Sequence, residues 1–259
     1  MRRLRATSAA LLAAALAFST HAAAQVDVAI DEPADERPRL ALMGTIPLYW
    51  GEAGDFGELL DSSNHAHWAR AVVERDFALA PLDFLTAEAL ARYDYLLLPQ
   101  PRALAGEENV ALDAWVRDGG RVLIFADPMM TGESRFALGD RRRPNDVALL
   151  SPILAHWGLE LRYDNAQDVD LHIADGEDGT SIPVNLPGSL KQVSGEECES
   201  ARADGLIARC AIGAGHALIV ADAALIDFDG PHDGAEAALE ALLAEAFGEI
   251  GENAGNGAP

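Results

Sequence analysis

The segment from Tyr93 to Pro128 constrains the fold more than any other part of the sequence. It contains two apolar runs, Tyr95 to Leu98 and Val122 to Ala126. The first run is followed by Pro99, and the second by Asp127 and Pro128. Continuous apolar runs of this length are typical of strands that are buried on both faces of a sheet.

A helix is predicted between these two strands, from Ala105 to Asp118. Leu112, Trp115 and Val116 share one face at helical spacing, and Gly119 follows at the position where such a helix is expected to end. A strand, a helix and a second strand in this order predict a parallel strand pair whose crossover helix packs against the sheet.

The remaining elements follow from apolar spacing and from glycine and proline positions. We expect an α/β fold with a β-hairpin elaboration in its C-terminal half. The predicted elements are strands at 40–43, 77–82 and 159–163, helices at 64–75, 86–90, 147–157 and 234–248, and a hairpin of 205–212 with 216–220. We also expect Thr86 to cap the helix that follows it, and Asp233 with Glu236 to form a capping box for the last helix.

The length fits one large or two small domains, and we expect a single domain with additional segments at both ends. The chain has 259 residues, of which 49% are hydrophobic and 24% charged, and these proportions are ordinary for a globular protein. The predicted organisation is a signal peptide at 1–24, a flexible lead-in at 25–38, a single domain at 39–248 with a β-rich insertion at 165–204, and a disordered tail at 249–259.

The N-terminus has the layout of a secretory signal peptide. Arg2, Arg3 and Arg5 precede the apolar run from Ala9 to Phe18, and three alanines precede Gln25. The run is short for a membrane span. The sequence therefore predicts export to the periplasm, with an uncleaved N-terminal anchor as the alternative.

The chain is strongly acidic, with a formal net charge of −23. The predicted signal peptide carries three of the basic side chains and no acidic one, so its removal makes the mature chain more negative. A nucleic acid would be repelled by such a surface, and we expect no nucleic-acid partner.

The two cysteines, Cys198 and Cys210, are predicted to form a disulfide, because an exported chain enters an oxidising compartment. The alternative is a pair of reduced thiols. Three glutamates surround Cys198 in the sequence, and their charge opposes thiolate formation. A nucleophilic cysteine is therefore not expected here.

Three stretches carry a family resemblance. The segment 93–128, with Asp94, Gly119, Gly120, Asp127 and Pro128, resembles the core of the class I glutamine amidotransferase-like domains, in the branch of gliding-type ABC-transporter auxiliary proteins. The stretches DVALLSPILAHWGLELRYD at 146–164 and IGAGHALIVADAALI at 212–226 are similar to later parts of the same family and stand in the same order. The resemblance implies an αβα sandwich with a flavodoxin-like, mostly parallel sheet.

The resemblance also argues against catalysis. Catalytic members carry a cysteine nucleophile on a sharp turn after the strand that corresponds to Val122–Phe125. In this chain the turn reads Ala126-Asp127-Pro128, with no cysteine or serine. Chemistry through a thioester is therefore not expected.

A ligand site is predicted beyond the carboxyl ends of the strands, where open α/β sheets bind ligands. Two loops should lie there, 44–60 and 129–146. Arginine side chains suit carboxylates and phosphates, and aromatic rings can stack on a ligand. The predicted ligand-binding residues, for a small anionic ligand, are Tyr49, Trp50, Asp127, Arg135, Arg141, Arg142 and Arg143. The alternative is that the arginines pair with carboxylates of this chain and that the aromatic residues pack the loop.

No metal site or cofactor is predicted. His65 and His67 are two residues apart on a predicted helix and therefore point in different directions. Asp168, Asp170 and His172 would share one face of a strand and could hold a divalent ion, but a solvated edge is the expected outcome.

These observations favour a non-catalytic periplasmic domain that binds a ligand or partner. The resemblance implies an auxiliary component of an ABC-type transport system, whose partners would be the membrane or ATPase subunits. Two alternatives are a divergent hydrolase that uses Asp127 and a histidine, and a structural scaffold of the cell envelope.

Overall fold

The structure is a computed structural model and describes residues 36–52, 66–176, 180–200, 202, 204–227 and 230–248. Every described residue lies in the unit 36–259. The predicted signal peptide, most of the lead-in and the predicted tail lie outside the described residues.

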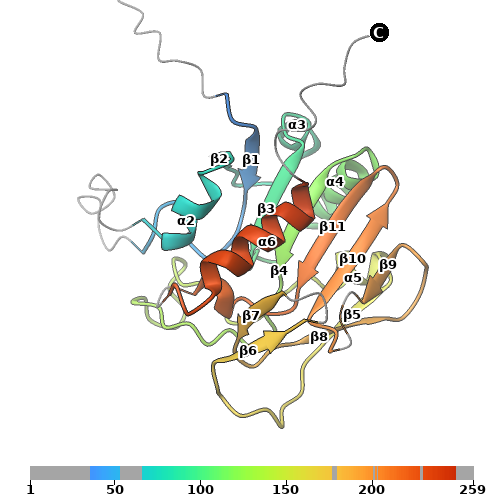
Figure 1. Cartoon of the computed structure of the whole chain (residues 1–259). Helices are drawn as coiled ribbons and strands as arrows, with labels where there is room; N and C mark the ends of the chain where they lie inside the picture. Colours follow the sequence, from blue (N-terminus) through green and yellow to red (C-terminus); the bar gives the residue numbers. More distant parts are fainter. Residues whose placement is uncertain are drawn as a thin grey trace, which may run out of the picture. The chain divides into compact units, whose positions relative to one another are not determined.

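The described unit is built around one central sheet of seven strands, with the order β2-β1-β3-β4-β11-β10-β9 (Figure 1). The first five strands of this order run parallel, and β10 and β9 are antiparallel to their neighbours. A mixed α/β fold with a mainly parallel sheet is thus confirmed. The strands are β1 (Arg39–Leu42), β2 (Ala78–Pro81), β3 (Tyr95–Pro99), β4 (Arg121–Phe125), β9 (Cys198–Ser200), β10 (Ile207–Ile212) and β11 (Gly215–Val220).

The segment from Tyr93 to Pro128 forms the centre of this sheet. Strands β3 and β4 pair in parallel, with Leu97 opposite Leu123, and helix α4 (Gly106–Arg117) connects them. Gly119 follows this helix with a φ of 117°, a left-handed conformation that favours glycine. The predicted crossover is therefore confirmed, and its helix has nearly the predicted bounds.

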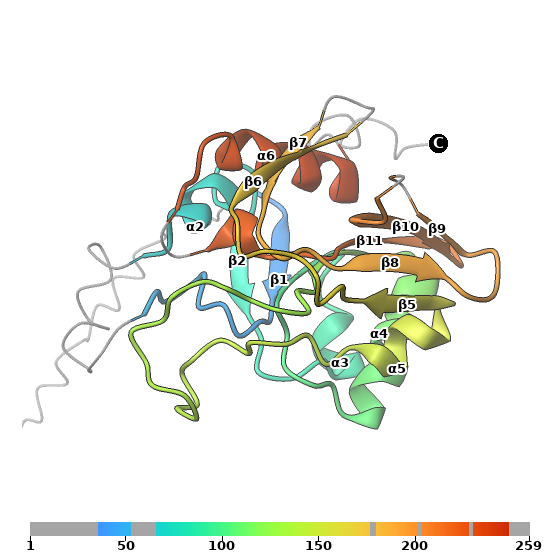
Figure 2. The same ribbon diagram turned by 90° about the horizontal axis from the view of Figure 1, so that it is seen from below.

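Helices cover both faces of the sheet, as Figure 2 shows. On one face lie α2 (Trp68–Val73) and α6 (Ala235–Phe247), and on the other lie α3 (Ala87–Leu90), α4 and α5 (Ser151–His156). Successive strand residues point to opposite faces. Accordingly Leu123 and Phe125 belong to one core, and Val122 and Ile124 to the other.

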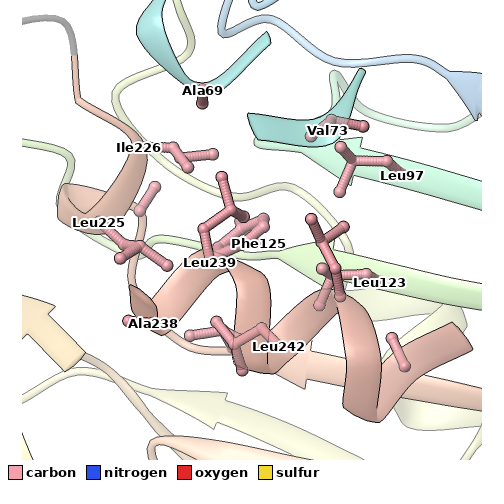
Figure 3. Close-up of a cluster of buried hydrophobic side chains, with 14 of the residues drawn as sticks. Ala69, Val73, Leu97, Leu123, Phe125, Leu225, Ile226, Ala238, Leu239 and Leu242 are labelled. Carbon is pink, nitrogen blue, oxygen red and sulfur yellow. The ribbon is translucent and has the colours of Figure 1, made fainter. Parts of the chain in front are cut away.

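The first of these cores joins α6 to the sheet (Figure 3). Leu239 and Leu242 of α6 are fully buried against a cluster that includes Leu123 and Phe125. Burying a leucine or phenylalanine side chain contributes about 1.5–3 kcal/mol. These contacts hold α6 against the sheet.

Helix α5 begins later than predicted. The apolar spacing predicts a start at Val147, but the helix starts at Ser151, and Pro152 stands in its first turn. A proline has no N–H to donate to the preceding turn and is tolerated only in the first turn of a helix. Leu149 therefore lies outside the helix and is 52% exposed.

Two further helix predictions need correction at their N-termini. Helix α2 starts at Trp68 rather than at Asn64, because the Nδ1 atom of His67 accepts a hydrogen bond from Ala69 N and caps the helix. The N-cap of α6 is Gly234, without a side-chain cap bond. The predicted capping box of Asp233 and Glu236 is therefore wrong. The cap of α3 by Thr86 is confirmed, with 3.1 Å from Oγ1 to Ala89 N.

The predicted β-rich segment holds three short strands besides β9, namely β6 (His172–Asp175), β7 (Ser181–Val184) and β8 (Ser189–Gln192). Strands β6 and β7 form a two-stranded antiparallel sheet, whereas β8 pairs with β5 (Leu159–Arg162). Cys198 of β9 lies opposite Cys210 of β10, and the two form a disulfide, which confirms that prediction. Within the described residues no helix is both long and apolar enough to span a bilayer.

Candidate functional site

Two aspartates lie at matching positions just beyond the carboxyl ends of neighbouring strands. Strands β4 and β11 pair in parallel, with Phe125 opposite Val220. Each strand is followed by an alanine and an aspartate, Asp127 after β4 and Asp222 after β11. Both aspartates are only 1% exposed. The sheet thus places two buried carboxyl groups at the edge where ligand sites of such sheets are found.

Asp127 connects three loops through hydrogen bonds. Its Oδ1 atom accepts a bond of 2.7 Å from Met129 N, and its Oδ2 atom accepts one of 3.1 Å from Ala223 N, in the loop after β11. Its own backbone N–H donates to Oε1 of Gln100, at 2.9 Å. Both carboxyl oxygens are therefore bonded to backbone N–H groups, and the residue stabilises the turns around it.

Asp222 has an equivalent role in the next turn. Its Oδ1 atom accepts from Ala224 N at 2.7 Å, and its Oδ2 atom accepts from Asn185 N at 3.1 Å. Asn185 directly follows β7, so this carboxyl group links the central sheet to the two-stranded sheet of β6 and β7. The two aspartates together hold the loops of this edge in place.

Burial controls the protonation of the pair. Burial raises the pKa of Asp127 to about 7, against the hydrogen bonds from Met129 and Ala223, which lower it. Burial also raises the pKa of Asp222 well above its usual range, and the negative charges of Asp127 and Asp227 raise it further. Two close carboxylates in a poorly solvated site resist being charged together. Burial and mutual repulsion therefore shift both carboxyl groups toward the protonated form.

Gln100 joins the two loops that were predicted to form the ligand site. Its side chain is fully buried and its Nε2 atom donates to the carbonyl oxygens of Asp127 and Asn145, at 3.0 and 2.9 Å. Thr45 donates from its Oγ1 atom to the carbonyl oxygen of Gln100 and accepts from Asn145 N. The loop after β1 and the loop after β4 thus meet at Gln100, which confirms that they share one edge of the sheet.

Three of the four predicted arginines bond to groups of this chain. Arg135 donates from Nη1 to the carbonyl oxygen of Glu52. Arg142 and Arg143 form ion pairs at 2.8 and 3.0 Å, with Asp140 and Asp146 respectively. Arg141 is exposed, and in the described part of the chain it has no hydrogen bond or ion pair. Arg141 is therefore the arginine of this loop that is most available to a ligand.

The two aromatic residues of the first loop differ in exposure. Tyr49 is half-buried, and the guanidinium of Arg70 lies 4.1 Å from the centre of its ring. Trp50 meets Tyr49 edge to face, with ring centres 4.7 Å apart, and is 54% exposed. Tyr49 thus packs the loop, whereas more than half of Trp50 is exposed to solvent. The rest of this loop, from residue 53, lies outside the described residues.

The described residues contain no group of three or more histidine, cysteine or acidic side chains that could hold a metal ion. Strand β6 begins only at His172, so Asp168 and Asp170 precede the strand and do not share a strand face with it. Of the two histidines weighed for a metal site, His65 is not described. His67 caps α2, and burial lowers its pKa to about 4.

The sequence-based site prediction missed Asp222 and Gln100. A signal for Asp222 was present, because the runs VLIFAD and ALIVAD both end an apolar strand with alanine and aspartate. Gln100 carries a weaker signal as the residue between Pro99 and Pro101. Its φ of 49° lies in the left-handed region, which is uncommon for a residue other than glycine.

One family model matches this chain over a range that includes part of this site. The model of the family described as ABC-type uncharacterized transport system matches residues 51–191. That range includes β3, α4, β4 and Asp127, and it ends before β11 and Asp222. Among curated proteins, the comparison finds no match.

Solved structures show similarity in fold only. The N-terminal domain of mmIFT52 superposes with a TM-score of 0.52 at 12% identity, over 80% of this chain and 96% of that domain. The cold-adapted β-galactosidase of Rahnella sp. R3 gives a TM-score of 0.45 at 16% identity, over 81% of this chain. The chain spans 31% of the length of that enzyme, whose activity therefore says nothing about this protein. By its sequence match over more than half of its length, this chain belongs to the family of ABC-type uncharacterized transport systems.

Proposed function

We propose that this chain is a non-catalytic auxiliary component of an ABC-type transport system, exported to the periplasm, where it binds a partner protein or a small anionic ligand. Family membership supports the transport role. The charged and apolar layout of residues 1–24 supports export. The transporter's membrane and ATPase subunits are the partners that this role implies.

The proposal includes a flavodoxin-like fold of the glutamine amidotransferase-like group. The supporting observation is the order of the parallel strands, β2-β1-β3-β4-β11. Numbered along the chain as parallel strands only, this is the order 2-1-3-4-5, which is that of flavodoxin-like sheets. In such a sheet the strand order reverses between β1 and β3, and Gln100 and Thr45 lie at the carboxyl ends of these two strands.

The main support for a non-catalytic role is the burial and hydrogen bonding of Asp127. This residue occupies the turn where a catalytic relative would present its nucleophile. Its carboxyl group is buried, and both oxygens accept backbone hydrogen bonds. A nucleophile or general base must reach the reacting atom of a substrate. A carboxyl group that is buried and hydrogen-bonded in this way stabilises the fold instead.

A hydrolase remains the second candidate, because one observation favours it. Asp127 and Asp222 form a carboxyl pair with raised pKa values at the edge of the sheet. Pairs of titratable groups with perturbed pKa values gather at catalytic sites. Access to the pair would require movement of the loops that cover it.

One experiment separates the two candidates. The wild-type protein and Asp127→Asn are incubated with a panel of esters, amides and glycosides, and each is co-purified with the membrane and ATPase subunits of the transporter. The proposed function predicts no turnover by either protein and a complex with the transport subunits. Turnover by the wild type that Asp127→Asn abolishes would establish the hydrolase instead. Failure of both proteins to form a complex would contradict the auxiliary role.

The anion site has its own test at Arg141. We expect Arg141→Ala to weaken binding of inorganic phosphate or citrate by about tenfold, the loss that follows when one charged hydrogen bond is removed. Arg142→Ala is the matched control, since Arg142 is already paired with Asp140. Calorimetric titration measures both affinities. Equal losses in the two variants, or no binding by the wild type, would remove the arginine loop as an anion site.

A further inference from the structure

A wide apolar groove lies between helices α3 and α4, on the face of the sheet that these helices cover. We call it the α3–α4 groove; Phe84, Leu85, Arg102, Leu104, Val110 and Ala111 line it, and it encloses about 1010 Å³. Pockets for small molecules usually have volumes of about 300–1,000 Å³ and bury most of their ligand. This groove is at the upper limit of that range and is open.

Two large apolar side chains at this groove face the solvent. Phe84 is 62% exposed and Val110 is 70% exposed. Single exposed apolar residues are ordinary on protein surfaces, but neighbouring ones around a groove indicate an interaction site. The side chain of Leu85 beside them is fully buried and provides an apolar floor.

The wall of the groove is held rigidly by one ion pair. Arg102 donates from Nη1 and Nη2 to the two carboxyl oxygens of Glu108, at 2.7 and 2.8 Å, and its guanidinium lies 5.3 Å from the centre of the Phe84 ring. Glu108 also accepts from Leu85 N and Ala105 N, at 3.1 and 2.9 Å. A rigid wall loses little conformational entropy when a partner binds.

The charge around the groove selects the partner. Asp83 and Glu107 are exposed beside it, whereas the positive charge of Arg102 is balanced by Glu108 and that of Arg92 by Glu88, at 3.1 Å. The rim is therefore negative in a chain that is acidic as a whole. A basic segment with an apolar face complements both properties, and amphipathic helices bind grooves in this way.

We propose that the α3–α4 groove binds a basic amphipathic helix of a partner protein, with the apolar face between Phe84 and Val110 and the basic side chains directed at Glu107 and Asp83. The identification of this partner as a transporter subunit rests on the proposed function. The lining of the groove includes neither Arg141 nor either carboxyl group of the pair.

The test uses the full chain and a helical peptide of about 15 residues, in which leucines recur at helical spacing and lysines fill the other positions. A scrambled peptide of the same composition is the peptide control. Fluorescence anisotropy measures both affinities. We expect the amphipathic peptide to bind at least about tenfold more tightly than the scrambled one, because only its leucines can enter the groove together.

Two variants test whether the peptide binds in the α3–α4 groove. Val110→Asp and Phe84→Ala should each weaken peptide binding by about tenfold, which is the effect of removing a central interface contact. Val169→Asp is the matched control, since Val169 is 73% exposed and outside the lining of the groove. It adds the same charge to the surface and should leave the affinity unchanged.

Three results would overturn the proposal: equal binding of the scrambled peptide, an equal loss in Val169→Asp, or a dimer of the chain that Val110→Asp dissociates. The last result would make a second copy the occupant of the groove. If peptide binding fails while the complex with transport subunits forms, the groove is wrong and the proposed function stands. If the peptide binds but no complex with the transport subunits forms, the groove is supported and the proposed function is wrong.

Discussion

The carboxyl pair predicts how the stability of this protein depends on pH. A carboxyl group whose pKa is higher in the folded state than in the unfolded state binds more protons when folded. The contribution of this group to the free energy of unfolding is then fully present below the pKa of the unfolded state. It is lost as the pH rises through the pKa of the folded state. For Asp127 these limits are the ordinary value of 3.8 and about 7.

The size of the effect follows from that interval. One pKa unit corresponds to about 1.4 kcal/mol, so Asp127 alone lowers the free energy of unfolding by up to about 4 kcal/mol between the two limits. His67 acts in the opposite direction, because burial lowers its pKa from 6.5 to about 4. It makes stability rise with pH between these values. The wild-type pH profile therefore mixes these two contributions with that of Asp222, whose pKa is also raised.

A comparison with Asp127→Asn removes the titration of Asp127 together with its repulsion of Asp222. The asparagine has nearly the same shape and stays neutral at every pH. We expect it to destabilise the protein at about pH 5, where the wild-type carboxyl group is neutral, because its amide N–H₂ faces a backbone N–H. From about pH 5 to about pH 7 its stability should improve relative to wild type, by up to about 1.4 kcal/mol per pH unit.

Urea unfolding followed by tryptophan fluorescence measures this difference. Trp157 is only 1% exposed and should report on the loss of the core. Asp140→Asn serves as the control carboxyl, since its pKa is lowered to about 2 by Arg142 and its protonation is therefore constant over this interval. A stability difference for Asp127→Asn that stays constant from about pH 5 to about pH 7 would show that Asp127 is ionised throughout, and would refute the argument.

Two further predictions concern stability. Replacing Cys198 and Cys210 by serine should lower the free energy of unfolding by about 3 kcal/mol, the loss expected when the bridged cysteines are 12 positions apart; an unchanged urea midpoint would contradict this. Gly44→Ala should destabilise by several kcal/mol, because an added Cβ would lie 2.1 Å from the carbonyl oxygen of Pro99. Gly106→Ala, with open space around its Cβ, is the control and should not destabilise the protein; equal thermal midpoints for both variants would show that the chain near Gly44 can move.

Much of the sheet could be predicted from local patterns. The strands at 95–99 and 121–125 lie within one residue of the apolar runs that predicted them. A strand buried on both faces needs apolar side chains at every position, and such a run is visible without knowledge of the tertiary structure. The hairpin of β10 and β11 was equally clear, because Gly213 and Gly215 frame its turn.

Other features depended on which elements become neighbours, and local patterns do not contain that information. The role of Asp222 requires β11 to lie beside β4, although about 90 residues separate them in the chain. The pairing of Arg142 and Arg143 with nearby aspartates likewise depends on the path of a loop without apolar period. The predicted start of α5 was wrong for a local reason. The prediction followed the apolar spacing back to Val147 and gave too little weight to Pro152, which stands in the first turn of the helix.

The disulfide between β9 and β10 also bears on how the chain behaves among its own copies. A sheet edge with unpaired backbone groups can recruit strands from other molecules and so begin aggregation. Here the edge strands are short: β2 has four residues and ends in Pro81, and β9 has three. The longer β10 would become an edge if β9 detached, and the bond from Cys198 to Cys210 keeps β9 in place. The solubility of this protein should therefore depend on an oxidising environment.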